Sequence, residues 1–476
     1  MKPSSNRIAL IIITTLFFMW GFITSMNDIL IPYLKKVFEL SRAQSMLVQF
    51  SFFTAYFIGS LIYFFFSVTT GDPIAKIGYK KSIIAGLVLS ALACVGFYPA
   101  AEMKVYGLFL AALFVLGLGF TILQIAANPY VSRLGNPETA SGRLNLSQGF
   151  NSLGTTLAPI IGGYLVFHFF AQVGQPLLDK LGQPVLTEAG TIISKTSVQI
   201  PYLIFAGVFL LLAVVFAMMQ LPKIVGEGSI PKKAGALRYT HLVLGMVAIF
   251  FYVGAEVSIG SVIINFSNEL LGFTEMKAKT FLALYWGGAM IGRFLGAISL
   301  GSNKTNTTKF LLMGLTGIAG FGLIYFAIYI ENGLAIKEIL PFLIFIGLNL
   351  IAFRMGNSKP AKTLFIFAIV ILLLLSVTMA TGSMIALWSL IAIGLFNSIM
   401  WSNIFTLAIR NLGVYTGQGS SLLVMMILGG ALLPFFQGFI ADWLGGYHNS
   451  FFVPMIAYLY LAYYGWKGYK SKTDLK

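Results

Sequence analysis

The first long apolar stretch of the chain contains one carboxylate among other oxygen-bearing side chains. Asp28 follows Asn27, and Thr24 and Ser25 precede it by four and three residues, so a helix places their oxygens on one face. Pro32, one turn later, removes a backbone donor and loosens the helix there. A carboxylate inside a membrane-spanning helix costs roughly 3 kcal/mol or more unless it is paired, hydrated or neutral. We predict that this cluster holds a proton or a small cation. The alternative is an aspartate hydrogen-bonded to a neighbouring helix.

Two later stretches carry rows of amide and hydroxyl side chains at helical spacing. Amides both donate and accept hydrogen bonds, which suits a neutral ligand rich in hydroxyl groups better than an anion or a lipid. Polar contacts between helices are the alternative interpretation. Because a lone acid lies in the same half of the chain, the rows favour a sugar-like ligand. The first row is Thr121, Gln124 and Asn128, and the second is Gln148, Asn151 and Thr155.

An aromatic side chain occupies the matching position in the second half of the chain. Asn397 and Trp401 share one helical face, and at an offset of 277 residues (401 − 124) Trp401 falls on Gln124. An aromatic plane can stack on the C–H face of a pyranose while amides bind its hydroxyl groups. We therefore add Asn397 and Trp401 to the predicted sugar site, with packing or an interface anchor as the alternative. Trp286 and Tyr252 are weaker candidates.

Glu256 is the second acid that falls inside an apolar stretch. It aligns with Ile23 rather than with Ser25 or Asp28, so it is expected to face away from a central cavity. It is either a second titrating group or a partner in a hydrogen-bonded interface, and the sequence leaves both readings open. Arg293 is expected at the inner end of a helix.

A short basic loop follows the second apolar stretch. The loop has two glycines, Gly71 and Gly78, which give its backbone conformational freedom. Its positive charge comes from lysines that include Lys76 and Lys80. Its plain interpretation is a cytoplasmic anchor, because Lys and Arg collect on that side of a membrane. Its functional interpretation is a conformational latch.

Composition excludes most other classes of protein. Of the 476 residues, 58% are hydrophobic and 10% are charged, whereas soluble domains carry about 25% charged residues. The net charge of +16 is not gathered into the basic arms of a nucleic-acid-binding protein. One cysteine and three scattered histidines leave no disulfide framework and no cluster for catalysis. We expect a polytopic membrane protein that is not an enzyme, with no catalytic residues, no cofactor and no metal site apart from one for sodium.

Apolar stretches of about 18 residues or more indicate helices that cross a bilayer. The first stretch is too long for a secretion signal, contains Asp28 and lacks a cleavage site, so we keep it as a mature helix. Most Lys and Arg residues then fall on the side of the N-terminus, which predicts that both termini are cytoplasmic. Fourteen spans are expected near residues 8–34, 43–69, 82–101, 105–131, 142–170, 199–221, 239–268, 276–300, 308–330, 337–353, 361–379, 383–409, 416–441 and 449–468.

A weak internal repeat divides the spans into two halves. Small and aromatic residues of the first half recur in the second at constant offsets, and the later offset is larger because the second half carries extra chain. We predict an all-α fold of two six-helix bundles with an inserted two-helix hairpin, in which a substrate binds near mid-depth between the halves. The expected parts are a first bundle over 1–221, a cytoplasmic linker over 222–238, and a second bundle over 239–476 with the hairpin at about 305–360.

Four segments give the chain a family resemblance over nearly its whole length apart from the hairpin. It resembles transporters of the major facilitator superfamily, and more narrowly the fucose permease and the bacterial glucose/galactose permeases. The resemblance implies twelve core helices, alternating access by rocking, and coupled uptake of a hexose. The segments are Asn-Asp-Ile-Leu at 27–30, Ala-Ala-Asn-Pro-Tyr at 126–130, Arg-Leu-Asn-Leu-Ser-Gln-Gly-Phe-Asn-Ser-Leu-Gly at 143–154, and the Asn-Leu-Gly and Gly-Ser-Ser parts of 411–421.

The resemblance also bears on single residues. It implies that Asp28, Gln148 and Asn151 line the cavity, and that the basic loop is the superfamily's loop between its second and third helices, with Ala75 in place of the usual acid. The proton-coupled fucose permease has a glutamate at the position of Gln124, and the glucose/galactose branch has an amide there. A proton relay through two acids therefore cannot use Gln124.

These observations predict a cation-coupled symporter for glucose or galactose in the bacterial inner membrane, working by alternating access. Asp28 is the expected coupling site, and sodium is favoured over protons because an ionised Asp28 ringed by oxygens suits a bound cation. A proton-coupled symporter for fucose or a related hexose is the alternative, and a membrane sensor or enzyme is a remote one. The expected partners are the hexose and the lipid bilayer, with no nucleic acid, and we expect a monomer. The particular hexose, the stoichiometry and the role of the hairpin stay open.

Overall fold

The computed structural model describes residues 3–170, 176–177, 183–184, 194–222, 231–301 and 304–471. Across these ranges the chain forms helices and no β-strand. The helices group into two units by their internal contacts: unit 1 comprises residues 1–130 and 153–233, and unit 2 comprises 131–152 and 234–476. The all-α architecture predicted from the apolar stretches is confirmed.

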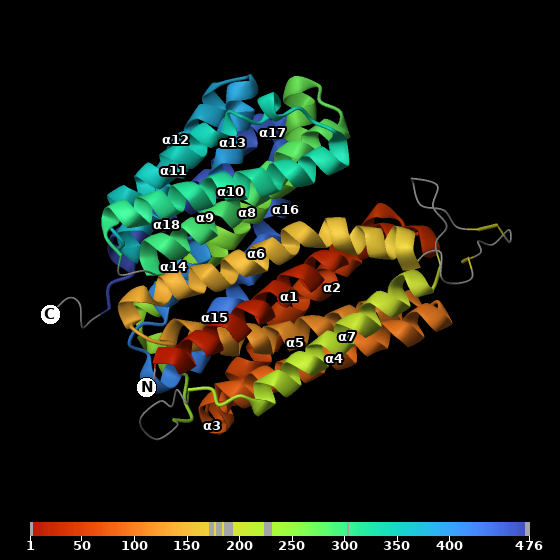
Figure 1. Ribbon diagram of the computed structural model, residues 1–476, viewed down its shortest axis with the longest axis vertical. Helices are drawn as coiled ribbons and strands as arrows, with labels where there is room; N and C mark the ends of the chain where they lie inside the picture. The colour runs from red at the N-terminus through yellow and green to blue at the C-terminus, as the bar shows by residue number, and fades with distance from the viewer. Residues whose placement is uncertain are drawn as a thin grey trace. The chain divides into compact units, whose positions relative to one another are not determined.

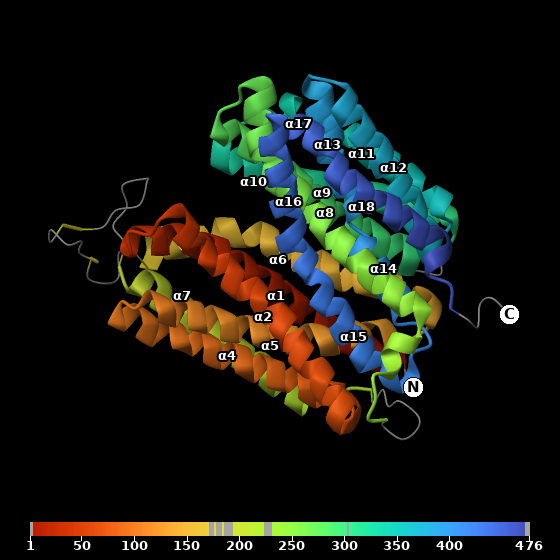
Figure 2. The same cartoon turned by 180° about the vertical axis from the view of Figure 1, so that it is seen from behind.

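Unit 1 is built from long apolar helices and one short basic one. Among its members α4 and α7 pack closely along their length, as Figures 1 and 2 show. The last residues of α5 and the first half of α6 group with unit 2. The helices are α1 (Pro3–Val37), α2 (Arg42–Thr70), α3 (Pro73–Ile77), α4 (Tyr79–Met103), α5 (Tyr106–Arg133), α6 (Ala140–Tyr164), which continues as a π-helix over Leu165–Phe169, and α7 (Thr196–Met218).

Unit 2 holds the remaining helices, and two of the spans predicted from the sequence are each broken into two helices there. The predicted span 383–409 is interrupted after Asn397, and the span 416–441 is interrupted by a turn of 3₁₀-helix at Met426–Leu428. The helices are α8 (Thr240–Leu271), α9 (Glu275–Gly301), α10 (Asn306–Asn332), α11 (Phe342–Gly356), α12 (Pro360–Ala380), α13 (Met384–Asn397), α14 (Met400–Ala408), α15 (Thr416–Met425), α16 (Gly429–Leu444), α17 (Tyr447–Ser450) and α18 (Phe452–Tyr463).

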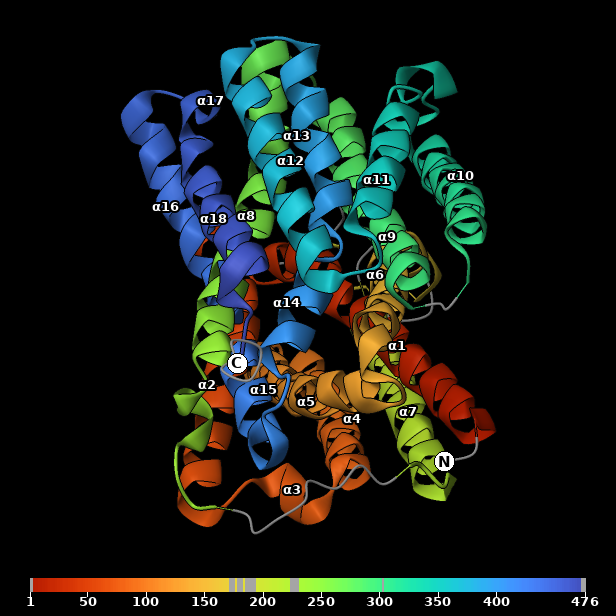
Figure 3. The same ribbon diagram turned by 90° about the vertical axis from the view of Figure 1, so that its left-hand side faces the viewer.

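Helix packing identifies which part of unit 2 is the insertion. In unit 2, α12 packs against α18 as α4 packs against α7 in unit 1, so α12 takes the place of the third helix of a six-helix bundle. The pair α10–α11 is then additional to the bundle. It packs on α9, α12 and α13, and in Figure 3 α10 lies at the edge of unit 2 opposite α16. This agrees with the hairpin expected at about 305–360.

Eleven of the described helices are long and apolar enough to cross a membrane. Three further predicted spans are helical but fall outside this set. The first is α6, whose row of amide and hydroxyl groups lowers its hydropathy, and the others are α11 with 15 residues and α18 with 12. The prediction of fourteen spans is consistent with this arrangement, and the chain is a polytopic membrane protein.

Each half of the chain contains helix crossings that leave no room for a side chain, and one crossing in each half corresponds to the other. A Cβ atom on Gly154 of α6 would lie 2.3 Å from the Phe18 carbonyl oxygen of α1, and one on Gly429 of α16 would lie 2.0 Å from the Phe250 carbonyl oxygen of α8. Small residues at such crossings let helix backbones approach closely. This matters in a bilayer because the hydrophobic effect does not drive helices together there, so close packing must hold them. In the internal repeat Gly154 falls on Gly429 at the later offset, 275 residues (429 − 154), so this part of the repeat reflects a repeated packing contact.

We expect Gly429→Ala to destabilise the protein, because the added methyl group meets a backbone oxygen that has no freedom to move aside. Overpacking of this kind costs about 1–3 kcal/mol, so the melting temperature in detergent should fall by several degrees. The matched control is Gly438→Ala on the same helix, where nothing lies within 4 Å of the added Cβ. An equal melting temperature for the two variants would contradict the close crossing.

Candidate functional site

Polar side chains from three helices of unit 1 meet around one tyrosine. The indole nitrogen of Trp20 on α1 donates to the Tyr56 hydroxyl of α2 at 3.4 Å, and both side chains are buried. The side chains of Thr24 on α1 and Gln124 on α5 lie next to the same hydroxyl. Gln124 is buried as well. The structure thus brings together one predicted ion ligand and one predicted sugar ligand, and adds Trp20 and Tyr56 to them.

The other predicted residues of unit 1 are placed only in part. Ser25 and Asn128 are buried side chains on α1 and α5. Asn27, Asp28 and Pro32 belong to helix α1, but their side chains lie outside the described part of the structure. The predicted ion site at Asp28 therefore stays a prediction.

The amide row of α6 belongs mostly to unit 2. Gln148 is buried and Asn151 is half-buried. Just beside them, Gly149 lies against the ring of Phe294 on α9, with 3.0 Å between an added Cβ and the ring. The absence of a side chain at Gly149 thereby lets α6 lie close to α9. Gln148 and Asn151 flank this contact on α6.

Asn397 connects three helices of unit 2 through its amide. Its Nδ2 donates to the Tyr285 hydroxyl of α9 at 2.9 Å, and its Oδ1 accepts from the Tyr458 hydroxyl of α18 at 2.6 Å. The Tyr285 hydroxyl in turn donates to the Glu256 backbone carbonyl oxygen of α8 at 2.9 Å. All these groups are buried. Both Nδ2 and Oδ1 of Asn397 are thus hydrogen-bonded to tyrosines of unit 2. This favours a role for Asn397 in positioning the helices over the predicted contact with a sugar.

Trp401 on α14 has a different environment. Its ring is 7% exposed and stacks on Phe405 at 6.0 Å between centroids. Within the described residues, its indole Nε1 is buried and has no hydrogen-bond partner. A buried donor without a partner costs about 1–3 kcal/mol, so the position is suited to a ligand or water that supplies an oxygen.

Glu256 forms a buried ion pair with Arg293. The carboxylate Oε1 of Glu256 on α8 lies 3.6 Å from Nη2 of Arg293 on α9, and the two side chains are 9% and 14% exposed. Arg293 precedes the end of α9 by eight residues, about 12 Å along the helix. The expectation that Arg293 sits at the inner end of a helix is therefore wrong: it lies more than two turns inside, where its partner is. Of the two readings of Glu256, the pair supports the interface partner.

Arg293 also donates a hydrogen bond to the backbone at the interruption between α13 and α14. Its Nε donates to the Ser398 carbonyl oxygen at 3.3 Å, between α13 and α14, and its Nη1 donates to the Ser152 hydroxyl of α6. A helix end leaves carbonyl groups without intrahelical partners, and a cation there is favoured by the helix dipole. Gly292 makes the approach possible, since a Cβ on it would lie 2.6 Å from the Leu395 carbonyl oxygen.

The basic loop of unit 1 contains the short helix α3, which Asp72 caps at its start and two glycines flank. Asp72 accepts from the backbone N–H of Ile74 at 3.0 Å and from the Tyr63 hydroxyl at 2.5 Å, which starts helix α3. Gly71 and Gly78 flank that helix with φ of +90° and +85°, a backbone conformation that favours glycine.

The two predicted latch lysines bind backbone carbonyl groups. Lys80 donates to the Ala217 and Met219 carbonyl oxygens, each at 2.8 Å, at the end of α7, and Lys76 donates to the Thr70 carbonyl oxygen at the end of α2. Both contacts place a cation at a helix C-terminus, where it is stabilised. The predicted latch thus joins parts of unit 1 without the acid that is missing at Ala75.

The hollows found in unit 2 lie elsewhere. One of about 690 Å³ opens between residues 132–141 and 406–416, and Arg133, Glu138 and Arg410 are among its lining residues. None of the predicted sugar ligands lines it. Enclosed space inside one unit therefore gives no independent support for the predicted sugar site.

Sequence reasoning did not predict the hydrogen bond between Trp20 and Tyr56 or the pairing of Arg293 with Glu256. It also did not predict the bonds of Asn397 to two tyrosines. Trp20 precedes Thr24 by four residues, so helical spacing was a usable signal for it. A lone cation and a lone acid on consecutive apolar helices were a usable signal for Arg293 and Glu256. Tyr285 and Tyr458 gave no such signal, because tyrosine is common in apolar helices and only its neighbours show what its hydroxyl binds.

We expect Glu256 and Arg293 to be energetically coupled. Removing one member of a buried pair costs about 3–5 kcal/mol because the other charge is left unpaired. Glu256→Gln should be severe, since a guanidinium does not lose its proton. The double variant Glu256→Gln with Arg293→Gln should be less destabilised than the sum of the single variants by about 1 kcal/mol or more, as measured by thermal unfolding in detergent.

The exposed pair of Glu275 and Lys279 on α9, 3.4 Å apart, is the matched control. Exposed pairs four residues apart couple by about 0.3–0.5 kcal/mol. If the effects at Glu256 and Arg293 simply add, or couple no more strongly than in this control, the pair does not hold α8 to α9.

Comparison with known proteins agrees with this architecture. The family model of the Major Facilitator Superfamily matches residues 11–353. The chain is 42% identical over 468 residues to the glucose/galactose transporter of Brucella abortus, covering 97% of this chain and 94% of that protein. It is 30% identical over 466 residues to the L-fucose-proton symporter of Escherichia coli, covering 96% and 92%.

A solved structure gives the same result for the fold. The crystal structure of the Escherichia coli fucose:proton symporter aligns with a TM-score of 0.73 and 27% identity, covering 98% of this chain and 99% of that one. The relatives and the fold are those of transporters and not of enzymes. The predicted family is confirmed, and the chain belongs to the Major Facilitator Superfamily.

Proposed function

We propose that this protein is a cation-coupled hexose symporter that takes up glucose or galactose by alternating access. The observation that carries the proposal is the 42% identity to the Brucella abortus glucose/galactose transporter, which extends over 97% of the chain. An identity spread over nearly every helix favours a shared substrate class. The bacterial relatives support placement in the inner membrane, and the distribution of Lys and Arg supports cytoplasmic termini.

The proposed sugar ligands are amides on α5 and α6 and one aromatic ring on α14. Gln124, Asn128 and Gln148 are buried side chains that both donate and accept hydrogen bonds. Asn151 lies on the same row as Gln148. Trp401 supports the proposal most directly, because its ring is buried and its indole N–H has no partner among the described residues. We assign Asn397 to positioning the helices around Trp401 rather than to the sugar itself.

The proposed coupling site is Asp28 with Thr24, Ser25 and Asn27. Glu256 is already paired with Arg293, so Asp28 is left as the intramembrane acid available for an ion. An unpaired carboxylate resists crossing a closed, dehydrated state, and a bound cation removes that penalty. Because Gln124 is an amide, a second carboxylate is not at hand for a proton relay at that position. This favours sodium as the coupling ion.

A proton-coupled symporter for fucose or a related hexose is the second candidate. It is favoured by the 30% identity to the Escherichia coli L-fucose-proton symporter and by the alignment with the structure of that symporter. Uptake into proteoliposomes separates the two candidates. Glucose and galactose accumulation under a sodium gradient at constant pH supports the first, and fucose accumulation under a pH gradient without sodium supports the second.

We expect Asp28→Asn to abolish accumulation of sugar against a gradient while leaving exchange intact. The asparagine is neutral in every state, so the empty carrier can return without the ion and the coupling is lost. Accumulation and counterflow of labelled hexose in proteoliposomes measure the two activities separately. Glu102→Gln is the control, since Glu102 pairs with Lys195 at the protein surface, at 2.8 Å, and should keep both activities. Accumulation by the Asp28→Asn variant would exclude Asp28 as the coupling site.

Trp401→Leu should raise the KM for sugar counterflow about tenfold. It removes a stacking surface and a buried donor, together worth about 1–2 kcal/mol, and 1.4 kcal/mol corresponds to a factor of ten. Trp443→Leu is the matched control because Trp443 is 77% exposed on α16 and makes no part of the proposed site. An unchanged KM for Trp401→Leu, with the protein folded, would remove Trp401 from the sugar site.

A further inference from the structure

The hairpin α10–α11 presents an apolar surface along its outward face. On α10 the exposed side chains Leu311, Leu315 and Ile318 recur every three or four residues. On α11 the stripe runs from Ile344, which is 66% exposed, to Met355. Such stripes fit the acyl chains of lipids, since the helices lie at the edge of unit 2.

One end of this hairpin carries positive charge without acids. Between Glu275 and Asp442 the acidic residues are Glu331, in the last turn of α10, and Glu338, in the segment that joins α10 to α11. The opposite end carries five basic residues, none of which forms an ion pair with another described residue. They are Lys304, Lys309, Arg354, Lys359 and Lys362.

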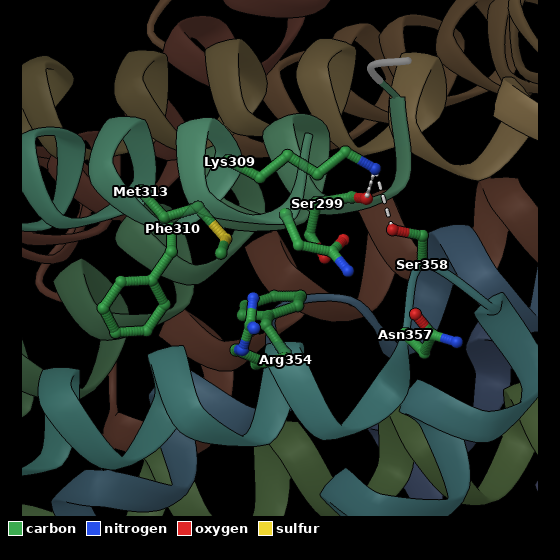
Figure 4. Close-up of a pocket in the computed structure, with 9 residues that line it drawn as sticks. Ser299, Lys309, Phe310, Met313, Arg354, Asn357 and Ser358 are labelled. Carbon is green, nitrogen blue, oxygen red and sulfur yellow. Dashed lines mark hydrogen bonds between the residues drawn. The ribbon is translucent and has the colours of Figure 1, made fainter. Parts of the chain in front are cut away.

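Two of these cations line a narrow hollow of about 10 Å³ between the two helices, shown in Figure 4. Lys309 is 8% exposed, and its ammonium group donates to the Ser299 carbonyl oxygen at 3.1 Å and to the Ser358 hydroxyl at 2.8 Å. Arg354 lies across the hollow from Lys309. Phe310 gives the same hollow an apolar wall that continues into the stripe of α10.

The backbone beside the hollow is held in an unusual conformation by the buried lysine. Asn357 and Ser358 have φ of +51° and +57°, a region that side chains other than glycine rarely adopt. The hydrogen bond from Lys309 to Ser358 fixes this turn directly after Arg354. The hollow is therefore a built feature and not a chance gap between mobile lysines.

The hollow has donors left over for an anion. An ammonium group has three N–H donors, of which Lys309 uses two, and a guanidinium has five. The guanidinium group of Arg354 donates no hydrogen bond to another side chain or carbonyl group within the described residues. Several donors, two positive charges and an adjoining apolar wall match a group that is anionic at one end and apolar at the other.

We propose that the inserted hairpin is a binding site for an anionic phospholipid. The phosphate group lies at the mouth of the hollow, whose interior has room for about one water, against the exposed Arg354 side chain and the third donor of Lys309. One acyl chain follows Phe310 and the apolar stripe of α10. Basic pockets between membrane helices are a recurrent way to bind such headgroups. The lipid thereby supplies the negative charge that this end of unit 2 lacks.

The test is the melting temperature of the purified full-length protein in detergent, titrated with phosphatidylglycerol or with zwitterionic phosphatidylcholine. Phosphatidylglycerol should raise the melting temperature and phosphatidylcholine should not. Arg354→Gln should leave the melting temperature without lipid unchanged and increase the phosphatidylglycerol concentration for half the effect about fivefold. Lys362→Gln is the matched control, an exposed cation on α12 that does not line the hollow.

Three results would overturn the proposal. Equal stabilisation by both lipids would mean that no headgroup charge is recognised. An equal loss in Lys362→Gln and Arg354→Gln would mean that the charge acts diffusely and that the hollow is not a site. Full stabilisation by inorganic phosphate alone would assign the hollow to a free anion and not to a lipid.

Discussion

The guanidinium group of Arg293 joins segments of unit 2 that are far apart in the sequence. It pairs with Glu256 on α8, donates to the Ser398 carbonyl oxygen where α13 ends, and donates to Ser152 on α6. In an environment without water, each of these groups would be costly if it were left alone. One charged side chain thus makes the break between α13 and α14 tolerable and fixes α8, α9 and α6 around it.

The break has a consequence for the proposed sugar site. Asn397 is the last residue of α13, and its amide is fixed by Tyr285 and Tyr458. Trp401 is the second residue of α14, directly beyond the break. Because both sides of the break are held by hydrogen bonds to neighbouring helices, the indole of Trp401 has a defined position although the helix is interrupted. A continuous helix would carry the same residues with its carbonyl groups satisfied internally and would give Arg293 nothing to bind there.

Hydropathy was enough to predict the helices, and the internal repeat was enough to predict the two bundles and the inserted hairpin, because both patterns can be read along the sequence without knowledge of its contacts. The breaks at residues 398–399 and 426–428 were not predictable. They depend on partners from other helices, such as Arg293 at the first break and the Phe250 backbone close to Gly429 at the second. The same holds for the candidate site: residue type singled out Trp401 and Gln124, whereas the bonds of Asn397 to two tyrosines followed only from their positions in space.

The hairpin shows why an insertion at this point is compatible with the bundle. Two helices return the chain to the same side of the membrane, so every later helix keeps its direction. In unit 2, α12 still packs against α18 as α4 packs against α7 in unit 1, which means that α10 and α11 displace no core contact. Helix α10 packs mainly on α9 and helix α11 mainly on α12, and one face of each is left to lipid. The basic residues at one end of the hairpin have no acidic partners among the described residues, so the proposed anionic lipid would complement a charge that the packing of α10 and α11 leaves unbalanced.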